Sequence, residues 1–135
     1  MGLYSLIATL TIHVLAGVFW AGSTSAMANL GDASAARLFP FQMGSAAVTL
    51  ATGAAMWWFQ LGSSFSLHEK ILLVGLVAAV LAATVQILFV GRSRRALAAS
   101  PESEAAIVGT MTTGNRAAAG LLMITVASMM IARFY

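Results

Sequence analysis

The sequence predicts an all-α integral membrane protein, a bundle of four transmembrane helices. Of its 135 residues, 60% are hydrophobic and only 8% are charged, whereas a soluble domain carries about 25% charged residues. The apolar residues fall into four segments, each close to the roughly 20 residues that a helix needs to cross about 30 Å of hydrocarbon. Helix is the expected state, because a lone strand would leave backbone groups unpaired in lipid.

The four predicted spans form one membrane domain over residues 1–135, with polar connections between them. The spans are residues 3–27, 41–59, 71–90 and 117–132. Pro40 precedes the second span, and its fixed backbone angle suits the first turn of a helix. The stretch 91–116 is the only long connection, and we expect it to be cytoplasmic. Within it Ser100 and Pro101 suit a helix start, which predicts a short surface helix or an extension of the fourth span.

The distribution of basic residues predicts the orientation of the bundle. Lys70 and Arg133 lie at the end that holds both termini, and five arginines lie at the other end, namely Arg37, Arg92, Arg94, Arg95 and Arg116. By the positive-inside rule the end with five arginines is cytoplasmic, so both termini face outward, to the periplasm. We therefore expect a multi-pass protein of the bacterial inner membrane. No basic stripe with interleaved aromatic residues is present, which argues against nucleic acid as a partner.

Small residues and amides predict how the helices pack. Small residues such as Gly17 and Gly53 are dense in the spans, and they let helix backbones approach closely in lipid. This pattern predicts a compact bundle in the lipid bilayer, with a second small-residue face for a homo-oligomer or a larger membrane complex. The amides of Gln86 and Gln42 need hydrogen-bond partners if they are buried, so we expect them to bridge between helices.

His13 is the leading candidate for function, because an ionisable ring inside a bilayer span is costly and marks a functional site by default. Three roles are open: a neutral ring bonded to a backbone carbonyl or to Thr49 or Thr52, a metal or haem ligand, or a proton relay. Helical spacing places Gly17 and Trp20 near the face of His13. The small Gly17 leaves room there for a partner helix or for the edge of a flat cofactor.

The remaining residue types restrict the chemistry. The chain has no cysteine, which excludes disulfides, thiolate metal sites and a thiol nucleophile. All four acidic residues fall outside the spans, so paired-carboxylate catalysis is not expected and a non-enzymatic role is favoured. Eight methionines are present, and thioether sulfur suits Cu(I). Met123 is expected at the depth of His13, and Met27 on its face, although methionine is also a common filler of apolar cores.

His68 opens the third span at the outer surface, beside Glu69. It is either a solvated residue of the helix start or part of an outward-facing metal site with Glu69. Residue 13 lies about 15 Å deeper than residue 3 along a straight helix. This difference in depth predicts that His13 and His68 of one chain do not ligate the same haem.

The spacing His13-x6-Trp20-x-Gly22 in an apolar first helix resembles the opening motif of the copper resistance D (CopD) membrane domain. Further stretches are similar to the second and third helices of that family: Arg37-Leu38-Phe39, Thr52-Gly53, Lys70-Ile71-Leu72-Leu73 and the arginines from Arg92 to Arg95. The resemblance implies a four-helix inner-membrane unit that binds or transports copper, with His13 as the first-helix histidine of the family.

Three functions therefore stand as expectations. The first is a Cu(I)-binding or transporting membrane protein, with candidate metal ligands at His13, Met123, Met27 and His68. The second is a haem-b membrane redox protein with His13 as an axial ligand and with Gly17 and Trp20 beside the cofactor. The third is an accessory subunit of a larger membrane complex that has no cofactor of its own.

Overall fold

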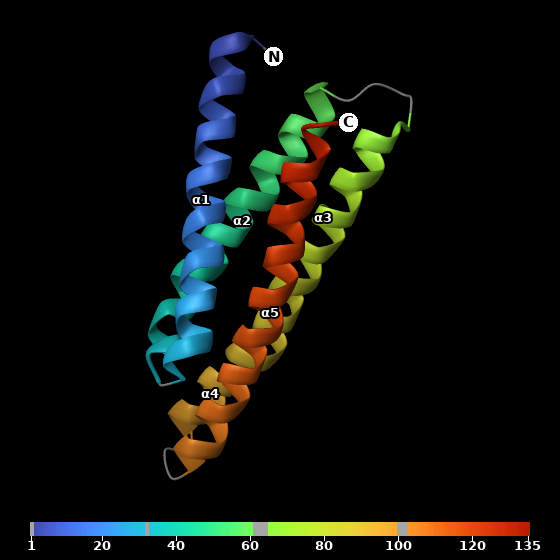
Figure 1. Cartoon of the computed structure of the whole chain (residues 1–135). Helices are drawn as coiled ribbons and strands as arrows, with labels where there is room; N and C mark the ends of the chain where they lie inside the picture. The colour runs from blue at the N-terminus through green and yellow to red at the C-terminus, as the bar shows by residue number, and fades with distance from the viewer. Residues whose placement is uncertain (1, 32, 61–64, 100–102) are drawn as a thin grey trace.

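The computed structural model describes residues 2–31, 33–60, 65–99 and 103–135, which are almost entirely helical (Figure 1). The helices are α1 (Leu3–Leu30), α2 (Ser34–Gln60), α3 (Leu67–Val85), α4 (Arg92–Ala99) and α5 (Glu104–Ala132). A π-helical turn, η1 (Gln86–Gly91), joins α3 to α4 without a break. The described residues thus form four long helices and no strand, which confirms the predicted all-α fold.

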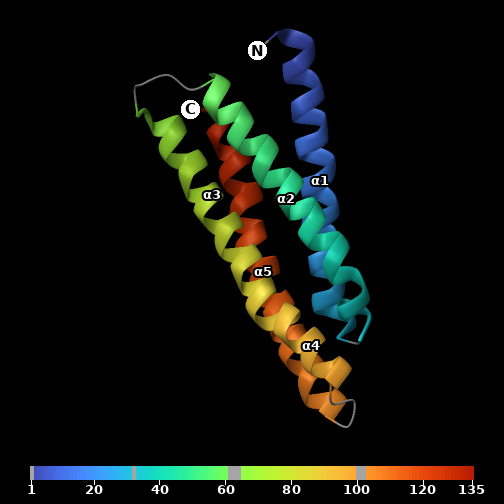
Figure 2. The same cartoon turned by 180° about the vertical axis from the view of Figure 1, so that it is seen from behind.

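The four long helices run antiparallel in sequence order, so that both termini lie at one end (Figures 1 and 2). α1 pairs with α2, and α3 pairs with α5 over most of their length. α5 also contacts α1, η1 and α4, whereas α2 barely touches α3. The bundle is therefore two helical hairpins that are held together mainly through α5.

Three of the long helices have the length and the apolar composition needed to cross a membrane, namely α1, the continuous helix Leu67–Ala99, and α5. The fourth, α2, is long enough at 27 residues but is not apolar enough by the same measure. Large apolar side chains cover the outside of the bundle, for example Leu15, Val77 and Ile124. An outer surface of this kind suits lipid rather than water, and it indicates a multi-pass membrane protein.

Two predicted boundaries differ from the structure. Pro40 does not open α2 but lies inside it, because the helix already begins at Ser34. The expected 91–116 connection is much shorter, since α4 continues the third helix to Ala99 and α5 begins at Glu104. The structure thus shows an extension of the fourth span instead of a separate surface helix. Ser100 and Pro101 lie outside the described residues.

Alanine and glycine line the contact between the hairpins. Ala46, Ala79, Ala82 and Ala118 are almost fully buried around Trp20. At such positions the backbones approach closely, and van der Waals packing replaces the hydrophobic effect as the main attraction between helices in lipid. The small-residue packing predicted from the sequence is therefore present.

A buried network of amides joins all four long helices near the middle of the bundle. The Trp20 indole N–H donates to Gln86 Oε1 over 2.6 Å. The Gln86 amide N–H groups donate to Thr24 Oγ1 (2.9 Å) and Asn115 Oδ1 (3.2 Å), and Gln42 Nε2 reaches the same Thr24 oxygen at 3.5 Å. All five side chains are at most 1% exposed. The predicted bridging role of Gln86 and Gln42 is confirmed.

Gly114 provides a direct test of the close contact between α5 and η1. A Cβ atom at Gly114 would overlap Phe89 Cβ, which is rigidly attached to the backbone, whereas a Cβ at Gly120 would meet nothing within 4 Å. We expect Gly114→Ala to lower the free energy of unfolding by about 1–3 kcal/mol, as overpacking does. Thermal unfolding followed by circular dichroism in detergent measures this effect. Gly120→Ala on the same helix is the control, and an equal loss in both variants would contradict the interpretation.

Candidate functional site

His13 lies where α1 joins the bundle. The ten helical residues before it, 3–12, are all exposed or half-buried, and His13 is the first buried side chain of α1, at 8% exposure. Its ring packs against Gly53 of α2, because a Cβ at Gly53 would lie only 3.1 Å from His13 Cε1. Glycine at position 53 thus makes the space that the imidazole fills.

Two hydrogen bonds hold the His13 ring on α2. His13 Nδ1 lies 2.9 Å from the carbonyl oxygen of Thr49 and 3.0 Å from Thr52 Oγ1. A carbonyl oxygen only accepts, and the Thr52 hydroxyl donates its own proton to the Val48 carbonyl at 2.7 Å. Nδ1 must therefore carry the ring proton and donate it. This contact with a backbone carbonyl and Thr52 is one of the roles expected for His13.

His68 repeats this arrangement on α3. Its Nδ1 lies 2.8 Å from the backbone carbonyl of Ala132, near the C-terminus of α5, so this nitrogen also donates. The adjacent Glu69 is engaged elsewhere, because Glu69 Oε2 accepts the backbone N–H of Ser66 (2.8 Å) in a capping box at the start of α3. His68 is thus held by α5, and the carboxylate expected beside it as a metal ligand serves the helix start.

The Nε2 atoms of both histidines are left without a hydrogen bond to any residue that the structure describes. In each ring the proton is on Nδ1, so Nε2 presents a lone pair. Histidines that bind metals usually donate their other N–H to a carbonyl or carboxylate, which fixes the tautomer and the ring orientation. His13 and His68 both have this arrangement, with Nδ1–H donated to a carbonyl and Nε2 available to a ligand.

Both histidines line one cavity of about 760 Å³ at the end of the bundle that holds the termini. Its wall is mostly apolar and includes Trp57, Trp58 and Phe65. The cavity exists because α1 packs on α2 and α5 and hardly contacts α3, so the outer part of the bundle is open between these helices. One cavity thus reaches both histidines, and the predicted difference in their depths stays a prediction.

The cavity also contains two methionines that the sequence reasoning did not select. Met56 of α2 and Met129 of α5 both line it. The helical spacing in the sequence could have pointed to them. Met56 follows Thr52 by four residues and Met129 follows Thr125 by four, so each methionine shares a helix face with a threonine near His13 or the cavity. Without knowing which faces of α2 and α5 point toward His13, however, neither methionine stands out from the other six.

The other predicted site residues lie away from this cavity. Met27 is 14 residues from His13 along α1, about 21 Å, in a separate apolar cluster with Met111 and Val90. Met123 is 66% exposed on the outside of α5. Trp20 belongs to the amide network, and Gly17 faces Thr49, which would lie 3.7 Å from a Cβ at that position. The structure thus places His13 and His68 on the wall of one cavity, which Met27, Met123, Trp20 and Gly17 do not line.

The donor set of the cavity favours some metals over others. Within the described part of the chain, no three His, Cys, Asp or Glu side chains cluster so that they could hold a metal ion. A bare Zn²⁺ ion needs about four such ligands. A metalloporphyrin brings its own ring nitrogens and needs only one or two axial ligands, which two histidines can supply.

In comparisons with known proteins, no model of a protein family, no curated protein and no solved structure matches the chain.

The hydrogen bonds predict that both rings carry their proton on Nδ1. Nitrogen NMR of protein labelled at histidine, under mildly alkaline conditions, distinguishes the two tautomers. We expect two signals of the Nδ1–H form, and His68→Gln assigns them by removing one. Thr52→Val should leave the His13 tautomer unchanged, because the Thr49 carbonyl remains as an acceptor. A proton on Nε2 of either ring would contradict the arrangement.

Proposed function

We propose that this protein is a multi-pass protein of the bacterial inner membrane that binds haem b in the cavity between α1, α2, α3 and α5, where His13 and His68 would hold the iron. The observation that carries the proposal is the pairing of the two histidines: each Nδ1–H is committed to a carbonyl, each Nε2 is unpartnered, and both rings line one apolar cavity.

The dimensions and lining of the cavity support a large planar cofactor. Cofactor pockets typically occupy about 300–1,000 Å³ and are mostly apolar with a few placed polar groups. The cavity has about 760 Å³, with aromatic side chains in its wall and with Gln60 and His68 toward its outer end. This distribution would suit a porphyrin, which has a large apolar body and a polar edge with two carboxylates.

Bound haem would supply one-electron redox chemistry or ligand sensing, and the chain's residues would set its surroundings. Leu6, Leu10, Leu72 and Leu76 keep the wall of the cavity apolar. An apolar shell controls the access of water and the redox potential of the metal. The hydrogen bond from His13 Nδ1–H to the Thr49 carbonyl raises the basicity of Nε2. Nε2 is therefore a better electron-pair donor to a metal.

The proposed orientation places this cavity on the periplasmic side. Arg37 lies in the first turn of α2, and Arg92, Arg94 and Arg95 lie in α4; these segments are at the end of the bundle opposite the termini (Figure 1). The positive-inside rule makes that end cytoplasmic. His68 then lies near the periplasmic surface, and His13 lies deeper in the membrane.

Titration of haem into the purified protein tests the proposal. We expect a Soret band that saturates at one haem per chain, with the low-spin spectrum of an iron that has two nitrogen axial ligands. His13→Ala and His68→Ala should each weaken binding by at least about tenfold and convert the remaining complex to a high-spin spectrum. Thr11→Ala, an exposed change on α1 outside the cavity, is the control and should bind haem as the parent does.

A second kind of variant distinguishes loss of the haem site from loss of folding in the histidine variants. Leu76→Trp would fill the cavity from α3 while leaving both histidines in place, and it should reduce haem binding. A protein that stays colourless after haem addition, or one that binds haem equally well in both histidine variants, would overturn the proposal.

Cu(I) binding is a second candidate, and the position of Met56 and Met129 beside the histidines favours it. The resemblance of His13, Trp20 and Gly22 to the first-helix motif of the CopD family implies the same chemistry. Thioether and imidazole ligands together suit Cu(I). The ligands would then be the methionines of the cavity, in place of Met27 and Met123.

Competition with a Cu(I) chelator tests this candidate. Replacing Met56 and Met129 together with leucine should weaken Cu(I) binding by at least about tenfold, which is typical of changes beside metal ligands. The matched control replaces Met27 and Met123 with leucine and should leave the affinity unchanged. The reverse result would restore the ligand set expected from the sequence, and no binding in the parent protein would remove the candidate.

A further inference from the structure

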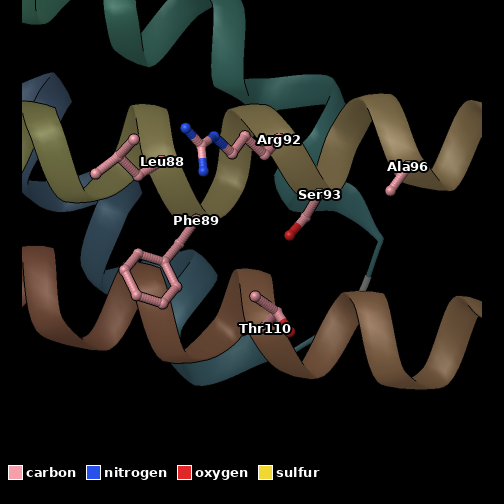
Figure 3. Close-up of a pocket in the computed structure, with 6 residues that line it drawn as sticks. All are labelled: Leu88, Phe89, Arg92, Ser93, Ala96 and Thr110. Atoms are coloured by element: carbon pink, nitrogen blue, oxygen red, sulfur yellow. The ribbon is translucent and has the colours of Figure 1, made fainter.

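A second concave site lies at the opposite end of the molecule, between η1–α4 and α5 (Figure 3). This groove has a volume of about 470 Å³, and its lining residues are Leu88, Phe89, Arg92, Ser93, Ala96 and Thr110. None of these residues belongs to the haem cavity or to the amide network. The groove therefore needs an explanation of its own.

The groove has an apolar end and a polar end. Leu88 and Phe89 lie at one end, and Arg92, Ser93 and Thr110 follow along the helices, with Phe89 over α5 and the Arg92 side chain extended toward Leu88 (Figure 3). No charged residue occurs from Ile71 to Gly91, a stretch of about 30 Å of helix. Arg92 is thus the first charge beyond a full hydrocarbon thickness, and the apolar end of the groove lies toward the hydrocarbon.

The polar groups of the groove are available to form hydrogen bonds or ion pairs with a bound molecule. Arg92 forms no ion pair with any residue that the structure describes. The Ser93 hydroxyl points between the helices toward Thr110 (Figure 3) and makes no hydrogen bond within the described ranges, although Ser93 is only 7% exposed. The Ser93 hydroxyl lines the groove, so an oxygen-rich group bound there would accept its proton.

We propose that this groove binds an anionic phospholipid of the cytoplasmic leaflet, with the phosphate on Arg92 and Ser93 and an acyl chain along Leu88 and Phe89. Guanidinium groups bind phosphate oxygens through several N–H donors, and basic pockets between transmembrane helices on the cytoplasmic side recognise anionic headgroups. The neighbouring arginines Arg94 and Arg95 add positive potential at the same level. The proposal rests on the membrane placement proposed above and is independent of haem or copper.

Native mass spectrometry of the full-length protein, released from mixed phosphatidylglycerol and phosphatidylcholine vesicles, tests this site. We expect one phosphatidylglycerol molecule to be retained in preference to phosphatidylcholine. Arg92→Gln should reduce that retention by at least about tenfold, because it removes charge-assisted hydrogen bonds to the phosphate. Arg94→Gln removes the same charge from an exposed position outside the groove, and it should change retention much less.

Two further measurements separate a specific site from general attraction. Ala96→Trp fills the groove and keeps every arginine, so it should also abolish preferential retention. Inorganic phosphate at millimolar concentration should not displace the lipid, because it cannot fill the apolar end. Equal losses in Arg92→Gln and Arg94→Gln, unchanged retention in Ala96→Trp, or displacement by free phosphate would each overturn the proposal. None of these outcomes depends on the cofactor of the other cavity.

Discussion

The hydrogen-bonded amide of Gln86 is the constraint on which the arrangement of the helices depends. It lies fully buried where α1, α2, η1 and α5 meet, and it bonds Trp20, Thr24 and Asn115 at once. An amide buried in apolar surroundings without partners costs about 1–3 kcal/mol or more. A shift of any one helix along its axis would break these bonds, so the network fixes the axial positions of the helices relative to one another. Contacts between small residues bring the helix backbones together.

This network divides the bundle into two parts with different properties. Toward the α1–α2 connection the helices close over Met27, Ala35, Val90 and Met111. Toward the end that holds the termini the two hairpins separate, and the cavity with His13 and His68 occupies the space between them. Changes at the groove beside Arg92 and at the cavity with both histidines should therefore act independently, because the amide network lies between them and their lining residues do not overlap.

The sequence was sufficient for the features that follow from the cost of polar groups in lipid. Hydropathy located the helices, and the need of buried amides for partners predicted the bridging by Gln86 and Gln42. One of the three roles expected for His13 was a bond to a backbone carbonyl or to Thr49 or Thr52, and the structure identifies the carbonyl as that of Thr49. What the sequence did not provide was long-range geometry: the cavity shared with His68 and Met129 depends on how far α1 diverges from α3. The extension of α3 into α4 was missed because charged residues such as Arg92 resemble a connection in a hydropathy profile.

The lack of buried side chains before His13 has a consequence for how a bulky cofactor could be inserted. Residues 3–12 of α1 form about three helical turns that bury little surface in the rest of the bundle. Segments with few buried contacts open locally at a lower free energy than the core does. Outward displacement of these turns from α2 would therefore widen the route by which a flat molecule reaches the cavity, with the hydrogen bonds of Gln86 intact.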